Sequence, residues 1–166
     1  MPGDELQAIG PVPRNTVEHE NRRRKNTTMM DCTPAALQVA GEALGDAGPV
    51  YMVNLVRYRG EAAYEVGTTL PPCSGREAYF KRYAPAFNTV AQGEDYGVFW
   101  VGNVHSVLVG TDGEAWDDIV IVRYASFAVL RRILESPAYA EQAAPHRRAA
   151  LTDWKFIVTT QPEIPR

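Results

Sequence analysis

The sequence predicts an α+β domain in which one antiparallel sheet carries helices on one face. Three observations lead to this fold class. Apolar segments rich in β-branched and aromatic residues read as strands, while other segments have helical periodicity and capping residues. Two of the strands are separated only by the Gly-containing residues 111–117, which is typical of a hairpin.

An opening helix is predicted over residues 34–44, with Thr33 as its N-cap and Pro34 at its first position. The first strand follows over residues 49–59. Asn54 is the unusual residue in it, because it shares a face with apolar neighbours. Residues 60–73 read as a loop long enough to be functional or mobile.

The clearest helix covers residues 74–93. It begins with a capping box of Ser74 and Glu77 and ends at Gly93. Its apolar face consists of residues spaced by four, four and three: Tyr79, Tyr83, Phe87 and Val90. Pro85 is expected to bend or split this helix. An aromatic stripe of this kind is usually core, and Tyr83 is its candidate ligand contact.

The hairpin consists of predicted strands over residues 98–110 and 118–126, and its pattern allows a β-bulge near Gly102. Without a bulge, alternate residues of the first strand share one face: Phe99, Val101, Asn103, His105 and Val107. On the second strand, Arg123 shares a face with Ile119 and Ile121.

Two helices and a final strand complete the domain. Ser126 caps a helix over residues 126–135, Pro137 begins another, and Pro145 is expected to interrupt it before His146. The last strand covers residues 153–161. With the opening helix set aside and the paired helices counted as one crossover, the order is βαββαβ, the ferredoxin-like arrangement. Both faces of its sheet carry bulky apolar residues, so a second copy is the expected cover and a symmetric dimer is predicted.

Composition limits the function classes. The 166 residues, 45% of them hydrophobic, suit one domain over residues 31–161, with a flexible charged tail over 1–30 and a short tail over 162–166. The net charge of −3 gives no basic field for nucleic acid or an anionic membrane. Neither a membrane span nor a secretory signal is recognisable, so a cytoplasmic protein is predicted. Its two cysteines read as reduced thiols.

Several motifs in order, PVYMVNLVRYR, SGREAYFKRY, GTDGEAWDDIVIVRYAS, SPAYAEQAAPHRRAAL and DWKFI, resemble the domain-of-unknown-function 1330 family. The resemblance covers about residues 34–160 and implies the dimeric α/β-barrel superfamily, with a pocket in each protomer. It marks these residues: Asn54, Ser74, Gly75, Tyr79, Tyr83, Trp116, Asp117, Tyr139, His146, Arg147 and Asp153. His105 and the long N-terminal tail depart from the family pattern. The superfamily includes cofactor-free monooxygenases, cyclases, isomerases, haem enzymes and stress-response proteins, so the resemblance implies fold more strongly than function.

The residues favour acid–base chemistry on a small organic molecule of aromatic, polyketide-like or lactone type. No metal-ligand spacing, phosphate loop or catalytic triad is recognisable, and no metal or cofactor is expected. The predicted catalytic residues are His105 and His146 as acid or base, with Asn54 as an oxyanion partner. The predicted binding residues are Arg123, Tyr83, Trp100, Asn103, Tyr139 and Arg147.

Structural roles compete with these assignments. His105 can be solvent-facing, and His146 with Arg147 can cap a helix end and meet Asp117 or Asp153. Tyr139 and His146 are seven residues apart and share a face of an unbroken helix. The first functional hypothesis is therefore a cofactor-independent cyclase, isomerase or monooxygenase-like enzyme. The alternative is a non-catalytic dimeric protein that binds a ligand or is associated with stress.

Overall fold

Four antiparallel strands form one sheet in the order β2-β3-β1-β4 in the computed structural model of this protein, which describes residues 31–162. The strands are β1 (Val50–Tyr58), β2 (Tyr96–Asn103), β3 (Asp118–Tyr124) and β4 (Leu151–Thr160). The α-helices are α2 (Pro34–Leu44), α3 (Gly75–Ala78), α4 (Ala84–Val90), α5 (Phe127–Leu134) and α6 (Ala144–Ala150). Two π-helical segments complete the set, η1 (Tyr79–Tyr83) and η2 (Tyr139–Ala143). The α+β prediction is confirmed, while the N-terminal tail and residues 163–166 lie outside the described residues.

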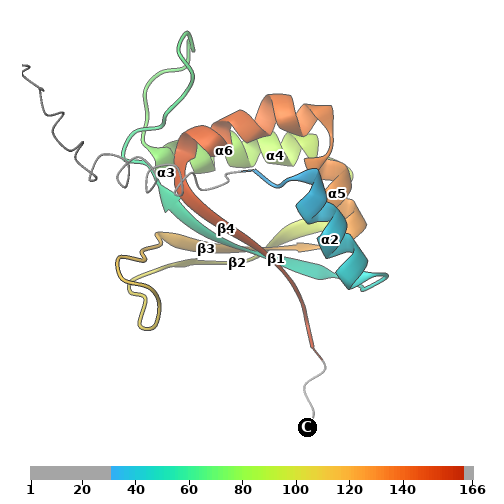
Figure 1. Ribbon diagram of the computed structural model, residues 1–166. Helices are drawn as coiled ribbons and strands as arrows, with labels where there is room; N and C mark the ends of the chain where they lie inside the picture. The colour runs from blue at the N-terminus through green and yellow to red at the C-terminus, as the bar shows by residue number, and fades with distance from the viewer. Residues whose placement is uncertain (1–30, 163–166) are drawn as a thin grey trace, which may run out of the picture.

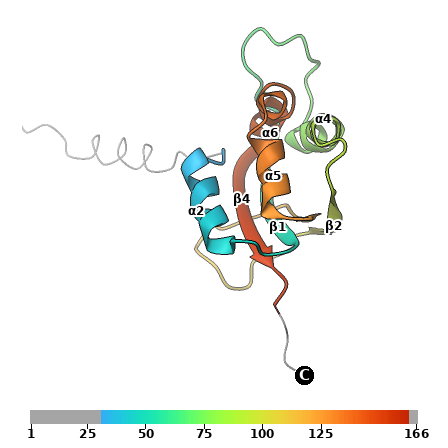
Figure 2. The ribbon, with the colours of Figure 1, turned by 90° about the vertical axis from the view of Figure 1, so that its right-hand side faces the viewer.

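The helices of the two crossovers lie together on one side of the sheet. Figure 1 shows α4 and α6 next to each other above the strands, and the π-helical segments are in contact with them. Helix α2 packs against α5 beside strand β4 (Figure 2). No helix within residues 31–162 has the length and apolar content of a membrane span.

The two faces of the sheet differ in what covers them. Val50, Met52 and Val56 of β1 face the helices and are buried in the core. Tyr51 and Val53 alternate with them and point to the opposite face, which no helix of the described residues covers. One face of the sheet therefore carries the core, and the other is an open apolar surface.

Strand β2 contains a β-bulge, although not at the predicted position. Its register with β3 shifts between Val98 and Trp100 rather than at Gly102. The extra residue sends both Phe99 and Trp100 to the open face, while Val98 and Val101 face the helices. The predicted alternation from Phe99 through Val101 is therefore wrong. A Cβ on Gly102 would overlap the ring of the half-exposed Trp100, so a side chain there requires that ring to move.

Both prolines predicted to break helices are accommodated by a wider turn. Pro85 and Pro145 have no N–H to donate and their rings crowd the preceding turn. In each case the alanine before the proline donates to a carbonyl five residues earlier, Ala84 to Tyr79 and Ala144 to Tyr139. The helices therefore continue through a π turn instead of splitting. Each π turn begins with a tyrosine six residues before the proline.

Candidate functional site

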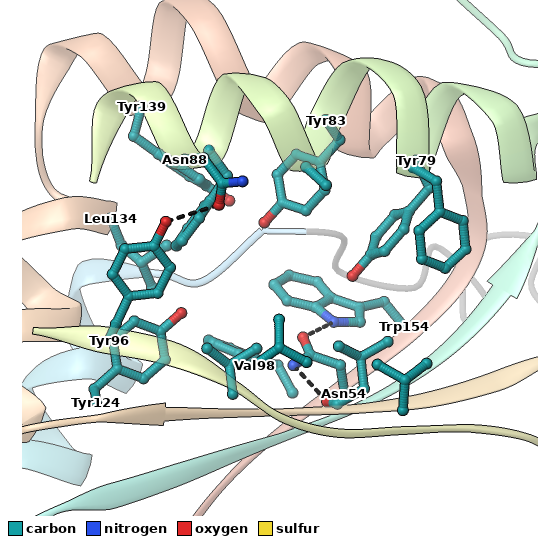
Figure 3. A pocket seen from close by; sticks show the side chains of 17 residues that line it. Asn54, Tyr79, Tyr83, Asn88, Tyr96, Val98, Tyr124, Leu134, Tyr139 and Trp154 are labelled. Carbon is teal, nitrogen blue, oxygen red and sulfur yellow. Dashed lines mark hydrogen bonds between the residues drawn. The ribbon is translucent and has the colours of Figure 1, made fainter. Parts of the chain in front are cut away.

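A cavity of about 180 Å³ lies between the helices and the sheet (Figure 3). Its walls are mostly aromatic and aliphatic side chains, among them Phe87 from α4, Val122 and Tyr124 from β3, and Trp154 from β4. Of the described residues, none with an acidic, basic or thiol side chain lines it. Such an apolar pocket with few polar groups is typical of small-molecule sites.

Three tyrosine hydroxyls are the distinctive polar groups of this cavity. Tyr79, Tyr83 and Tyr124 turn their rings toward it (Figure 3) and make no hydrogen bond to any other residue within 31–162. Burial raises the pKa of all three phenols well above the ordinary value, so they stay protonated at neutral pH. They therefore present neutral hydrogen-bond donors to an otherwise apolar space.

Two further tyrosines of the wall already have partners. Tyr96 donates to Asn88 Oδ1 at 2.7 Å, and the Tyr139 hydroxyl accepts a hydrogen bond from Arg147 Nε at 3.1 Å. Tyr83 and Tyr139 thus line the cavity as predicted, with Tyr83 the one whose hydroxyl is available for a ligand.

Asn54 also lines the cavity, but its amide hydrogens are in use. Its Nδ2 donates to the carbonyls of Met52 at 3.2 Å and Val120 at 3.0 Å, and its Oδ1 accepts from Trp154 Nε1 at 3.0 Å. The predicted role of Asn54 as an oxyanion donor would require one of these hydrogen bonds to break. Its observed role is to hold the Trp154 ring in the cavity wall.

Arg147 is buried directly behind this wall. Besides its hydrogen bond to Tyr139, its Cζ lies 4.2 Å from the centre of the Trp154 ring, and it is paired with Asp31. Burial opposes the charge of Asp31, but Arg147 and Arg148 outweigh this and lower its pKa. The sequence suggested Asp117 or Asp153 as the acid. Asp117 instead accepts the Tyr58 backbone N–H, because it lies at the hairpin corner.

His146 lies outside the cavity. Its Nδ1 is 2.9 Å from the hydroxyl of Tyr64, in the loop after β1, and burial together with Arg82 lowers its pKa. The inward pair of Tyr139 and His146, which an unbroken helix would allow, does not form. The π turn between them contains an extra residue. A spacing of seven residues therefore no longer places the two side chains on the same face of the helix.

Three other predicted residues also lie away from the cavity. His105 is exposed in the loop after β2, because the strand ends at Asn103. Arg123 is on the open face and pairs with Asp95 at 3.2 Å. Trp100 is on the same open face because of the bulge. The described residues contain no cluster of three or more His, Cys, Asp or Glu that could hold a metal ion.

The cavity opens between edge strand β2 and the helix formed by η1 and α4. Val98, Val101 and Phe80 line it and are 66%, 46% and 39% exposed, so they form its mouth. Asn103, a predicted binding residue, lies one inward position beyond Val101. It donates to the buried Asp118 at 2.6 Å instead of lining the cavity.

Sequence reasoning missed this polar cluster at the end of the mouth. Asp118 also accepts hydrogen bonds from Tyr58 Oη at 2.8 Å and Arg76 Nη1 at 2.6 Å. The available signal was Asp118, a charged residue at the start of the apolar strand β3 whose side chain faces inward. The members of the cluster come from β1, β2, β3 and α3, so their association depends on the tertiary structure.

Two solved structures are similar to most of this chain. The crystal structure of the methylated RPA0582 protein is 31% identical, with a TM-score of 0.71, and the match covers 84% of this chain and 99% of that chain. A second crystal structure, of the RPA0582 protein of unknown function from Rhodopseudomonas palustris, is 33% identical with a TM-score of 0.68. That match covers 84% of this chain and 100% of that one. No protein-family model and no curated protein matches the sequence.

Proposed function

Because this chain belongs to the family of the Rhodopseudomonas palustris protein RPA0582, itself of unknown function, we propose a function from the chain's own cavity. The protein binds a small, flat, largely apolar organic molecule that carries at least one hydrogen-bond acceptor. The body of the ligand occupies the aromatic cavity and its acceptor meets the tyrosine hydroxyls.

The observation that carries this proposal is the convergence of three unpaired donors on one apolar space. A buried hydroxyl without a partner has a free-energy cost of about 1–3 kcal/mol. The hydroxyls of Tyr79, Tyr83 and Tyr124 have no hydrogen-bond partner within residues 31–162, but they keep accessible surface toward the cavity. An apolar ligand that fills the cavity would remove that access to water and leave them in this condition. A carbonyl or phenol oxygen in the cavity would satisfy them, whereas an additional apolar group would not.

The proposal includes a ferredoxin-like dimer of the domain-of-unknown-function 1330 family. The strand order β2-β3-β1-β4 with both helical crossovers on one face supports the ferredoxin-like arrangement. Phe99, Trp100 and Ile157 on the open face are 63%, 50% and 44% exposed, which supports a second copy as its cover. A cytoplasmic location remains a prediction.

A second candidate function is a cofactor-independent cyclase or isomerase. The three phenols favour it, because neutral donors that face one cavity can stabilise an enolate or phenolate oxygen. The observed positions of His105 and His146 do not support them as its general base. In this candidate the tyrosines stabilise charge, and the proton acceptor is a group of the substrate or water.

Titration with naphthalene carboxamide, a flat neutral molecule with a carbonyl acceptor, tests the binding function. We expect saturable binding by calorimetry and a shift of the Trp154 indole N–H signal in NMR, because that indole lines the cavity. Val98→Trp should abolish binding by filling the mouth. Val66→Trp, at an exposed valine outside the cavity, is the matched control and should bind normally.

The hydroxyls are tested separately by Tyr83→Phe and Tyr124→Phe. Each should weaken carboxamide binding about fivefold, since one hydrogen bond contributes on the order of 1 kcal/mol. Neither should reduce stability, because each removes an unpaired hydroxyl. Absence of saturable binding, or binding that Val98→Trp leaves intact, would contradict the proposed site.

A further inference from the structure

We propose that the ligand carries a carboxylate and that Arg76, at the mouth of the cavity, binds it. This inference rests on the proposed function, because it assigns the chemical class of the molecule that enters the cavity. The argument depends on how Arg76 is held, on which of its donors remain unused, and on its position beside the mouth.

The Arg76 guanidinium lies against two neighbouring aromatic rings. Its Cζ lies 5.3 Å from the centre of the Tyr58 ring and 5.1 Å from that of Phe80. Its Nη1 donates to Asp118 at 2.6 Å, while its side chain remains 51% exposed. The guanidinium is therefore oriented by the protein but still accessible from solvent.

Asp118 has the properties of a residue that orients Arg76. It is completely buried and also accepts hydrogen bonds from Tyr58 and Asn103, so both of its oxygens have partners. The remaining Arg76 donors, on Nε and Nη2, make no hydrogen bond to the part of the chain that the structure describes. Two adjacent N–H groups of a guanidinium match the two oxygens of a carboxylate.

Arg76 is also continuous with the cavity. Phe80, on which the guanidinium rests, lines the mouth. On the sheet side, Val101 and Val120 line the cavity, and Asn103 and Asp118 occupy the next inward positions of the same strands. A flat molecule seated against Phe80 therefore has its outer end close to the free edge of the guanidinium.

The surrounding charges favour a carboxylate over a phosphate. Asp118 already neutralises part of the Arg76 charge. The nearby Lys81 is paired with Glu77 at 2.7 Å and contributes no second free cation. One guanidinium beside a buried acid suits a monoanion, whereas a dianionic phosphate would be repelled by that acid.

The test compares 6-hydroxynaphthalene-2-carboxylate with 6-hydroxynaphthalene-2-carboxamide, which have nearly the same shape and differ in charge. In both probes the hydroxyl oxygen can meet the cavity tyrosines while the other end of the ring system reaches Arg76. Calorimetry on the full-length protein at neutral pH should show the carboxylate binding about tenfold more tightly, as a charged hydrogen-bonded pair at a half-exposed site allows. Arg76→Gln should remove this preference by weakening carboxylate binding and leaving carboxamide binding nearly unchanged.

Two further variants control for structural damage. Arg76→Gln leaves the buried Asp118 without its cation, so the double variant Arg76→Gln with Asp118→Asn removes both charges and should lose the preference equally. Arg132→Gln changes an arginine of similar exposure, paired with Glu94 and outside the cavity lining. It should keep the preference.

The outcomes separate the two proposals. Equal affinity of the wild type for the two probes, or a preference that persists in both Arg76 variants, would overturn the carboxylate inference and leave the cavity proposal standing. If neither probe binds the wild type, the proposed function fails and the inference fails with it. Loss of both probes in the folded Arg76 variants would also overturn the inference, because it would give Arg76 a general structural role.

Discussion

Arg147 shows how one buried cation supports several residues of the site. It is only 2% exposed, and it donates to Tyr139 and stacks on Trp154 from behind the cavity wall. Its ion pair with Asp31 also fixes the chain just before α2. A residue that the sequence suggested as a ligand contact therefore positions two wall residues without lining the cavity itself.

Arg147→Met should lower the free energy of unfolding by about 1–3 kcal/mol, because it leaves the buried Tyr139 hydroxyl without its donor and removes one of the two arginines paired with Asp31. Urea unfolding followed by tryptophan fluorescence measures this change. Arg148→Met is the control, since Arg148 is 45% exposed and shares the same aspartate. Its effect should stay below about 1 kcal/mol. Equal losses in the two variants would contradict the supporting role of Arg147.

At the scale of residues, the sequence predicted side chains within regular segments and failed where a segment is irregular. The cavity is lined by Asn54, Tyr83 and Tyr139. These three were predictable because the alternation of side chains along the strand and the spacing of apolar residues along the helices are regular up to those positions. Trp100 was misplaced by a bulge and His146 by a π turn, each of which inserts one residue. One inserted residue changes the face of everything after it, and local composition does not fix where it occurs.

At the scale of elements, order and type were predictable, but the docking of α3 was not. Caps at Thr33, Ser74 and Ser126 were recognisable, and all three accept the expected backbone hydrogen bonds. The close approach of α3 to the junction of α6 and β4 depends on Gly75. A Cβ there would lie 2.6 Å from the backbone N and O of Arg59 and would also overlap the Ala150 carbonyl.

Gly75→Ala should therefore destabilise the protein by about 3 kcal/mol, since backbone on both sides would have to move. Thermal unfolding followed by circular dichroism measures the effect. Gly60→Ala is the matched control, because a Cβ at Gly60 meets nothing within 4 Å. It should change stability by less than about 0.5 kcal/mol. Similar melting temperatures for the two variants would show that α3 docks more loosely than its geometry indicates.

At the scale of the whole molecule, the asymmetry between the two faces of the sheet is the dominant feature. The helix-facing side contains the core and the cavity, whereas the open face presents Phe99 in edge-to-face contact with Tyr51, 5.0 Å between ring centres. Exposed apolar area of this kind is usually covered by a partner, and a symmetric pair of identical faces is the simplest cover.

We expect light scattering after gel filtration to give the mass of a dimer at micromolar concentration. Phe99→Asp should shift the protein to a monomer, because it places a charge in the contact. Val66→Asp adds the same charge at an exposed valine in the loop after β1 and should remain dimeric. A monomeric wild type, or a Phe99→Asp variant that stays dimeric, would contradict the proposed interface.

In the proposed ligand-binding function, the three tyrosine hydroxyls that line the cavity would also determine which molecules it rejects. A hydrocarbon of suitable shape would fill the space but leave the donors of Tyr79, Tyr83 and Tyr124 permanently without water or acceptor. A site built to meet polar atoms discriminates most strongly against an analogue that lacks them. Selectivity in this protein would therefore come less from the fit of the ring than from the penalty imposed on any ring without an oxygen.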